Sequence, residues 1–149
     1  MKFDSFHQYV LQTFPDGSVI LEFGSGFNTA LLVAKFIVYT VEQDPKFLNL
    51  VPSAHYILAP IENEGWYSVD VLKNELPEIY DLVIIDGPKG GHSRRGVLDH
   101  LDLLNTGVPW IFDDTNRSFD YKTMLKFCHM VGKEHSDFQT REKRFSVIQ

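Results

Sequence analysis

The chain contains a single cysteine, Cys128, among its 149 residues. One cysteine cannot form an internal disulfide, and its place in an apolar pattern is typical of a core residue in a reducing compartment. No apolar run approaches the roughly 18 residues of a membrane span, and the N-terminus lacks the apolar core of a signal peptide. The sequence therefore predicts a cytoplasmic protein with no membrane partner.

Positive charge is also scarce. The chain has 14 Lys and Arg residues against 20 Asp and Glu residues, which gives a formal net charge of −6. A sequence-independent nucleic-acid binder needs a basic surface, so this composition predicts that nucleic acid is not a partner. Repeats, low-complexity tracts and Gly/Ser-rich linkers are absent as well. Residues 1–149 are therefore predicted to form one domain.

What the chain does contain is a regular alternation of apolar strands and amphipathic helices. Strands are predicted at residues 18–23, 36–42, 55–59, 80–86 and 108–112. Helices are predicted at residues 3–14, 28–35, 44–51, 69–76, 97–104 and 121–131. The tail from residue 135 shows two short strands around 140–143. This order predicts an α/β fold, a doubly wound and mostly parallel sheet with helices on both faces and a C-terminal antiparallel hairpin.

The first predicted strand ends in Gly24-Ser25-Gly26, and the second strand ends in Glu42. Glycines let the backbone approach a ligand closely, and the helix that follows offers free N–H groups to an anion. An acid about 20 residues further on, at the end of the second strand, accepts hydrogen bonds from ribose hydroxyls. The spacing therefore indicates a nucleotide half-site, although Gly-x-Gly alone also fits a simple turn.

Two residues choose between nucleotide ligands. Thr29 stands where a dinucleotide fold usually has a third glycine, beneath the pyrophosphate. Glu22, two residues before the first glycine, would repel a pyrophosphate but attract an ammonium group. S-adenosylmethionine combines an amino acid end, a ribose and an adenine without any phosphate, so these residues favour it over NAD. The alternative is that Glu22 is a solvated residue at a strand end.

Acidic residues occupy four of the five predicted parallel strand ends. Ligands of open parallel sheets bind outside the carboxyl ends of the strands, so acids far apart in sequence converge there. This convergence predicts an active site rather than a binding turn alone. The acids are Glu22, Glu42, Asp86 and the pair Asp113-Asp114.

Three further motifs make the pattern more specific. They are Trp66-Tyr67, then Asp86-Gly87-Pro88 followed by Arg94-Arg95-Gly96, and finally Asp113-Asp114-Thr115-Asn116-Arg117. With these motifs the chain resembles the class I S-adenosylmethionine-dependent methyltransferases, and within them the small bacterial O-methyltransferase-like proteins. The resemblance covers Val19 to Gln149 and implies a single-domain Rossmann-like fold.

The resemblance also implies roles for the residues of the first half. Gly24 and Gly26 would border the methionine part of the cofactor, and Glu22 would face its ammonium group. Glu42 would hold the ribose hydroxyls, and Asp86 would lie beneath the sulfonium. Trp66 would cover the adenine or the substrate, with a core aromatic as an equal alternative. The cofactor carboxylate would meet Ser25, Phe27, Asn28 and Thr29.

The acids of the second half have two alternative roles, in a metal site or in a network of ion pairs. Asp86, Asp113 and Asp114 resemble the metal set of catechol-type O-methyltransferases, except that Asp114 stands where Asn is usual. Converging carboxylates repel one another, and Mg²⁺ or Ca²⁺ would relieve this and aim a substrate hydroxyl at the methyl group. The alternative is a metal-free network in which Arg94, Arg95 or Arg117 pairs with these acids.

The predicted reaction is O-methylation of a hydroxyl on a glycan or small metabolite, because the amino-methylating Asn/Asp-Pro-Pro-aromatic signature and paired cysteines are absent. The predicted catalytic residues are Asp86, Asp113 and His92, the last as a general base or else an ordinary loop residue. Few residues precede the first strand, which predicts an open pocket for a large substrate or one completed by a second copy of the chain. The alternative function is a catalytically idle S-adenosylmethionine- or nucleotide-binding module that acts with a partner.

Overall fold

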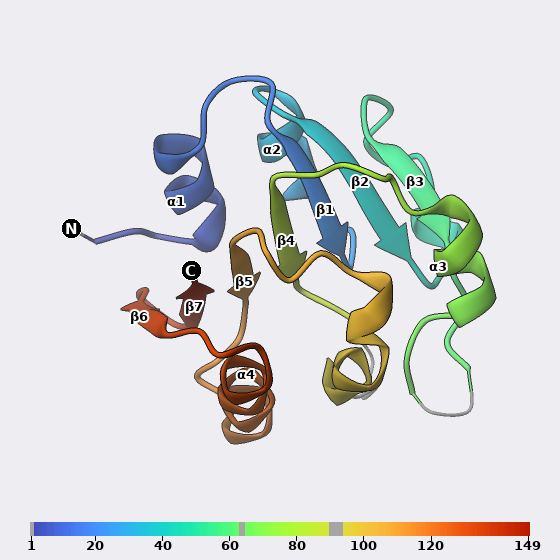
Figure 1. The fold of residues 1–149 in the computed structure, drawn as a ribbon. Helices are drawn as coiled ribbons and strands as arrows, with labels where there is room; N and C mark the ends of the chain where they lie inside the picture. The colour runs from blue at the N-terminus through green and yellow to red at the C-terminus, as the bar shows by residue number, and fades with distance from the viewer. Residues whose placement is uncertain (1, 63–64, 90–93) are drawn as a thin grey trace.

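A computed structural model describes residues 2–62, 65–89 and 94–149 and shows one seven-stranded sheet (Figure 1). The strand order is β3-β2-β1-β4-β5-β7-β6. The strands are β1 (Val19–Phe23), β2 (Ile37–Glu42), β3 (His55–Leu58), β4 (Leu82–Ile85), β5 (Trp110–Phe112), β6 (His135–Gln139) and β7 (Arg144–Ile148). β1 to β5 pair parallel with one another, whereas β7 pairs antiparallel with both β5 and β6.

The α-helices are α1 (Phe6–Thr13), α2 (Thr29–Val33), α3 (Val69–Glu75) and α4 (Ser118–Val131), with 3-10 helices η1 (Pro45–Phe47) and η2 (Arg94–Leu103). The predicted fold class is confirmed, including the C-terminal hairpin. Of the segment 97–104, predicted as an α-helix, residues 97–103 belong instead to η2, whose backbone is non-helical at His100. Across the described ranges, no helix has both the length and the apolar character needed to cross a membrane.

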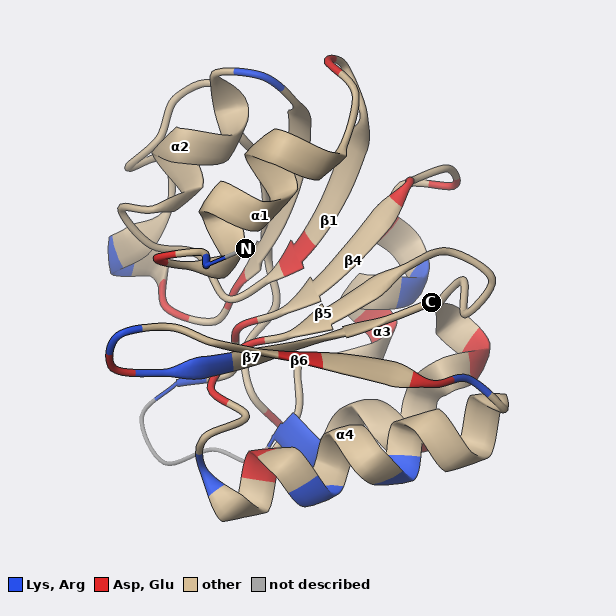
Figure 2. Cartoon of the chain, turned by 90° about the vertical axis from the view of Figure 1, so that its left-hand side faces the viewer, with Lys and Arg blue, Asp and Glu red and all other residues tan. Residues whose placement is uncertain are grey.

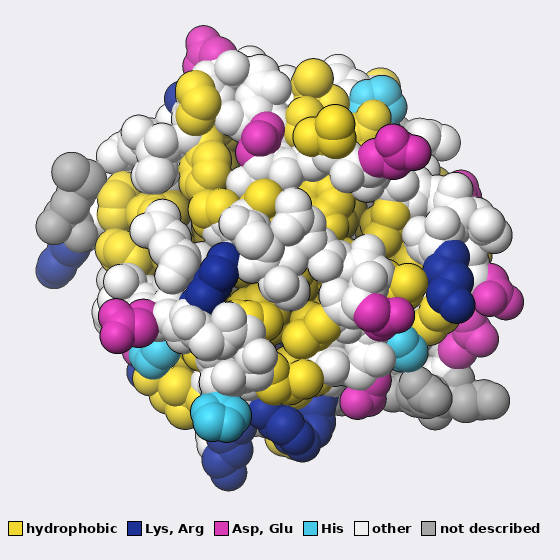
Figure 3. All heavy atoms as spheres, viewed as in Figure 1, with side chains coloured by type: hydrophobic (Ala, Val, Ile, Leu, Met, Phe, Trp, Pro, Cys, Tyr) yellow, Lys and Arg dark blue, Asp and Glu magenta, His cyan; other side chains and the backbone are white. Residues whose placement is uncertain are grey.

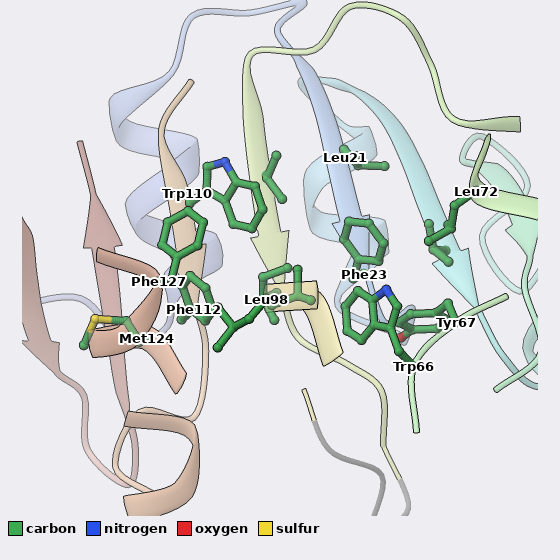
Figure 4. Close-up of a cluster of buried hydrophobic side chains, with 14 of the residues drawn as sticks. Leu21, Phe23, Trp66, Tyr67, Leu72, Leu98, Trp110, Phe112, Met124 and Phe127 are labelled. Atoms are coloured by element: carbon green, nitrogen blue, oxygen red, sulfur yellow. The ribbon is translucent and has the colours of Figure 1, made fainter. Parts of the chain in front are cut away.

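Apolar side chains on both faces of the sheet form the core. Leu21 and Phe23 of β1 point to one face and join Trp66, Trp110 and others in one buried cluster (Figure 4). Ile20 points to the other face and packs in a second cluster with residues of α1 and α2. Because side chains alternate along a strand, a buried central strand needs apolar residues at nearly every position. Figure 2 shows α1 and α2 on one side of the sheet and α4 on the other.

Candidate active site

Two adjoining cavities lie at the carboxyl ends of the parallel strands. The smaller has a volume of about 570 Å³ and is bordered by the glycine turn after β1 and by the end of β2. The larger measures about 1130 Å³ and lies between the start of α1, the loop after β5 and the β6–β7 loop. The smaller volume lies within the usual range of ligand sites in proteins, about 300–1,000 Å³, and the larger lies slightly above it. The two cavities share His7, Asn28, Asp86 and Lys89.

The glycine turn after β1 brings two strand ends into close contact. Gly24 has φ +97°, and a Cβ atom there would lie 2.6 Å from the backbone carbonyl oxygen of Asp86. Only glycine adopts this φ readily and leaves room for the neighbouring strand end. The close approach places Asp86, which follows β4, directly beside the turn. The glycine that the sequence predicted as a ligand contact is therefore also needed for the fold.

We expect Gly24→Ala to lower the free energy of unfolding by about 1 kcal/mol more than Gly17→Ala does. Gly17 is a matched control, since its φ is +81° but a Cβ there has no atom within 4 Å. Both substitutions carry the cost of a positive φ, about 1 kcal/mol, and only the first adds an overlap with Asp86. Urea denaturation measures the difference. Equal effects of the two substitutions would show that the turn relaxes without cost.

Glu22, at the end of β1, is buried and lines the smaller cavity. Its Oε1 atom accepts hydrogen bonds from the hydroxyls of Thr29 at 2.8 Å and Thr40 at 2.7 Å. Burial raises the pKa of Glu22 to about 7, against the lowering effect of these two hydrogen bonds. The alternative of a solvated strand-end acid is therefore wrong. Thr29, expected to meet a cofactor carboxylate, is hydrogen-bonded to Glu22.

Glu42, at the end of β2, is also buried beside the smaller cavity. Its Oε1 atom accepts a hydrogen bond from the Ser25 hydroxyl, and its Oε2 atom accepts one from the backbone N–H of Asp44 at 2.8 Å. These contacts fix the carboxylate at the cavity wall. Next to it, Oε1 of Gln43 is buried without a hydrogen-bond partner among the residues that the structure describes. A ligand with hydroxyl or amino donors would satisfy this set.

Trp66 lies in the hydrophobic core and lines neither cavity. Its ring is 2% exposed and packs against Phe23, with centroids 5.3 Å apart, and against Gly96. Of the two alternatives, the core aromatic is confirmed, and the prediction that Trp66 covers the adenine or the substrate is wrong. The neighbouring Tyr67 lines the smaller cavity instead. Sequence spacing did not distinguish them, because adjacent side chains of an irregular segment point in unrelated directions.

The three acids after β4 and β5 come together, as predicted. Carboxylate oxygens of Asp86, Asp113 and Asp114 all lie within 4.8 Å of one another. Burial raises the pKa of Asp86 well above its usual value, and the Asp113 carboxylate raises it further. Asp86 alone of the three lines both cavities.

Arg94 of η2 binds this acidic cluster directly. Its guanidinium lies 2.9 Å from Oδ2 of Asp114 and 3.8 Å from Oδ1 of Asp86. It also donates hydrogen bonds to the backbone carbonyl oxygens of Asp113 at 3.1 Å and Asp86 at 3.3 Å. Arg94 is only 4% exposed, so these contacts replace nearly all of its hydration.

A second cation reaches the same acids from the β6–β7 loop. Lys143 Nζ lies 3.0 Å from Oδ1 of Asp114 and 3.5 Å from Oδ2 of Asp113. Although burial opposes the effect, Lys143 and Arg94 hold the pKa of Asp114 below its usual value. Asp114 has φ +58°, a left-handed conformation that Asp and Asn adopt more readily than most residues. Arg117, 57% exposed at its side chain, adds a longer contact of 3.5 Å.

These cations bear on the predicted metal site. Mg²⁺ and Ca²⁺ bind free carboxylate oxygens, whereas Arg94, Arg117 and Lys143 already contact the oxygens of Asp114. A divalent ion bound to this carboxylate would face their positive charges at short range. The donor set of the structure therefore fits the metal-free alternative, with Arg94 as the principal partner, and the metal remains an untested prediction. His92, predicted as a general base, lies outside the described residues.

The larger cavity contains residues that the sequence did not point to. They come from the start of α1 and from the β6–β7 loop, namely Asp4, Ser5, Phe6, His7, Thr140, Arg141, Glu142 and Lys143. No local pattern marks them, because nearly the whole length of the chain separates these two segments. Only the antiparallel return of β7 beside β5 brings the hairpin loop to the strand ends.

Comparison with known proteins gives no sequence relative. No protein-family model and no curated protein matches the chain. Solved structures do match it in three dimensions. An rRNA methylase from Streptococcus thermophilus is 15% identical, with a TM-score of 0.63 over 97% of this chain and 93% of that one. Aeropyrum pernix fibrillarin, with natively bound S-adenosyl-L-methionine, is 17% identical, with a TM-score of 0.66 over 91% and 67%.

The chain has the same fold as these two proteins. The B. subtilis M1A22 tRNA methyltransferase TrmK shares it as well, with 17% identity and a TM-score of 0.60 over 99% of this chain and 65% of that one. These likenesses confirm the Rossmann-like fold that the motifs implied. They do not show that the chain belongs to the narrower O-methyltransferase-like group, and that membership remains a prediction.

The prediction that nucleic acid is excluded as a partner is wrong. Structures of this fold include an rRNA methylase and a tRNA methyltransferase. The deduction failed because net charge averages over the whole surface. On the face in Figure 3 positive side chains stand singly or in small groups among acidic and hydrophobic ones. The larger cavity is lined by five of the 14 Lys and Arg residues, namely Lys89, Arg94, Arg117, Arg141 and Lys143, together with six acidic residues.

Proposed function

We propose that the protein is an S-adenosylmethionine-dependent methyltransferase. The observation that carries the proposal is the pair of adjoining cavities that meet at Asp86, one lined by the glycine turn and Glu42 and the other large and polar. A group transfer between two molecules requires two such sites side by side, since reacting atoms must approach to about 3 Å. The methyltransferase fold supports the same function.

The smaller cavity fits the cofactor by its donors and acceptors. Glu42 would accept hydrogen bonds from the ribose hydroxyls, and Glu22 would face the amino group. Gly24 and Gly26 leave the backbone open to the methionine chain, and Asn28 lies at the start of α2. When bound, the cofactor supplies an electrophilic methyl group on a sulfonium. Tyr67 and Phe47 add aromatic walls to the same cavity.

We place the acceptor in the larger cavity, with an oxygen atom as the methyl acceptor. The Asp86 carboxylate would accept a hydrogen bond from the acceptor hydroxyl, because it alone of the clustered acids borders both cavities. Arg94 would hold Asp86 in place through the contacts described above. The volume of about 1130 Å³ suits an acceptor larger than one sugar or nucleotide unit. A glycan hydroxyl is one acceptor of this kind. RNA is included among the acceptors to be assayed.

We expect Glu42→Ala to weaken the binding of S-adenosylhomocysteine by about tenfold to a hundredfold, because charged hydrogen bonds contribute about 1.5–3 kcal/mol. Isothermal titration calorimetry measures the dissociation constants. Glu75→Ala is the control, because Glu75 is exposed on α3, away from both cavities. An unchanged dissociation constant for Glu42→Ala would contradict the placement of the ribose.

Two further measurements separate this function from its alternatives. Stabilisation by NAD without stabilisation by S-adenosylhomocysteine would indicate an oxidoreductase. Transfer of a labelled methyl group is then assayed against glycans, small hydroxyl compounds and RNA. Tight cofactor binding without transfer to any of them would favour the idle binding module.

A further inference from the structure

His7 has a buried side chain whose ring nitrogens lack hydrogen-bond partners in the described parts of the protein. The residue is 4% exposed, and neither ring nitrogen has a hydrogen-bond partner there. Its ring lies tilted by 31° against that of Phe6, with centroids 3.7 Å apart, and His7 borders both cavities. Burying unsatisfied nitrogens costs free energy, which a ligand with a matching group would recover. His7 therefore points to a ligand at the junction of the cavities.

The backbone beside His7 offers further donors. His7 is the second residue of α1, and the Ser5 side chain caps this helix by accepting from the N–H of Gln8. The N–H groups of Phe6 and His7 have no acceptor within the helix, because the residues four positions earlier precede it. The first turn contains no acidic residue, and it lines the larger cavity. A helix N-terminus with free N–H groups favours an anion.

Two lysines from other elements act on the same place. Lys143 of the β6–β7 loop and Lys89 after β4 both line the larger cavity. Burial, together with the positive charges of these two lysines, lowers the pKa of His7 to about 4. Lys89 reaches across the cavity junction, with its Nζ 3.6 Å from the position of a Cβ at Gly26. Six acids also line this cavity, and two of them, Asp113 and Asp114, contact Lys143. The other four are Asp4, Asp86, Asp120 and Glu142.

We propose that His7, the N-terminal turn of α1, Lys89 and Lys143 form a binding site for a phosphate group of the acceptor. The imidazole N–H and the free backbone N–H groups would donate to the phosphate oxygens, and the two lysines would balance its charge. The assignment to the acceptor rests on the proposed function. It follows from position, because Ser5, Phe6 and Lys143 border the larger cavity and not the smaller one.

The test uses inorganic phosphate and dimethyl phosphate as probes, with acetate for comparison. We expect both phosphates to raise the pKa of His7 in NMR titrations of the ring resonances, which are assigned by their loss in His7→Phe. We expect His7→Phe and Lys89→Met each to weaken phosphate binding by about tenfold, the effect of one charged hydrogen bond. The matched controls are His55→Phe and Lys73→Met, at exposed positions of β3 and α3. The His7→Phe protein is expected to fold, because the ring lies against Phe6.

Four outcomes would overturn the proposal. The first is a wild-type His7 resonance that millimolar phosphate does not move, and the second is equal binding by His7→Phe and wild type. The third is competition between phosphate and S-adenosylhomocysteine but not between phosphate and 5′-methylthioadenosine, which would assign the site to the cofactor carboxylate. Stronger binding of acetate than of phosphate would likewise assign it to a carboxylate. Additive binding of phosphate and S-adenosylhomocysteine supports the proposal. If S-adenosylhomocysteine does not bind at all, the proposed function fails while the phosphate titration still reports on the anion site.

Discussion

Replacing Arg94 by Met is expected to lower the free energy of unfolding by about 3–5 kcal/mol, the usual cost of breaking a buried ion pair from one side. Met keeps the apolar stem but leaves the Asp114 carboxylate, 4% exposed at its side chain, without its partner at 2.9 Å. The backbone carbonyl oxygens of Asp113 and Asp86 lose their donors as well. Urea denaturation of the variant and the wild type measures the effect.

Arg117→Met is the matched control for Arg94→Met. Arg117 contacts the same carboxylate oxygen, but at 3.5 Å and from a side chain that is 57% exposed. Exposed ion pairs contribute little, so we expect a loss below about 1 kcal/mol. The wild-type unfolding midpoint should also be the same with and without EDTA. A loss of stability in EDTA that Mg²⁺ restores, with little effect of Arg94→Met, would instead support the metal site.

Glu22→Gln is expected to stabilise the protein at pH 8 by about 3 kcal/mol and to have almost no effect at pH 4. The folded-state pKa of Glu22 is about 7, above the ordinary value of 4.5, mainly because the carboxyl is buried. The stability of the neutral carboxyl is therefore fully present below pH 4.5 and is lost as the pH rises to 7. Gln keeps an oxygen that accepts from Thr29 and Thr40 but never ionises.

His7 affects the pH dependence in the opposite direction. Its folded-state pKa of about 4 lies below the ordinary 6.5, so stability is lost as the pH falls from 6.5 towards 4. We therefore expect a nearly flat wild-type profile between these values, with Glu22→Gln revealing the acid-side loss from His7. Denaturation midpoints across pH 4 to 8 measure both effects. A wild-type profile and a Glu22→Gln profile that run parallel would show that folding does not raise the pKa of Glu22.

The strand ends show how far local pattern predicts a site. Glu22, Glu42 and Asp86 lie at the cavities where the sequence placed them, because the carboxyl ends of parallel strands meet at one edge. The interaction partners of the acids could not be predicted from the sequence in the same way. The sequence offered Arg94, Arg95 and Arg117 equally as partners for the acid cluster, and the geometry favours Arg94 and adds Lys143. Ion pairing depends on distances of a few tenths of an ångström, which residue spacing does not contain.

The sequence by itself determined the α/β fold with its mostly parallel sheet, the glycine turn and the acids at the strand ends. Each follows from periodicity or from a residue's own conformational limits, which act over a few residues. Only the tertiary structure decided that Trp66 lies in the core, that Lys143 reaches the acids and that His7 closes the junction of the cavities. These contacts join segments far apart in the chain, and the packing of α1 and the β6–β7 hairpin against the sheet fixes them.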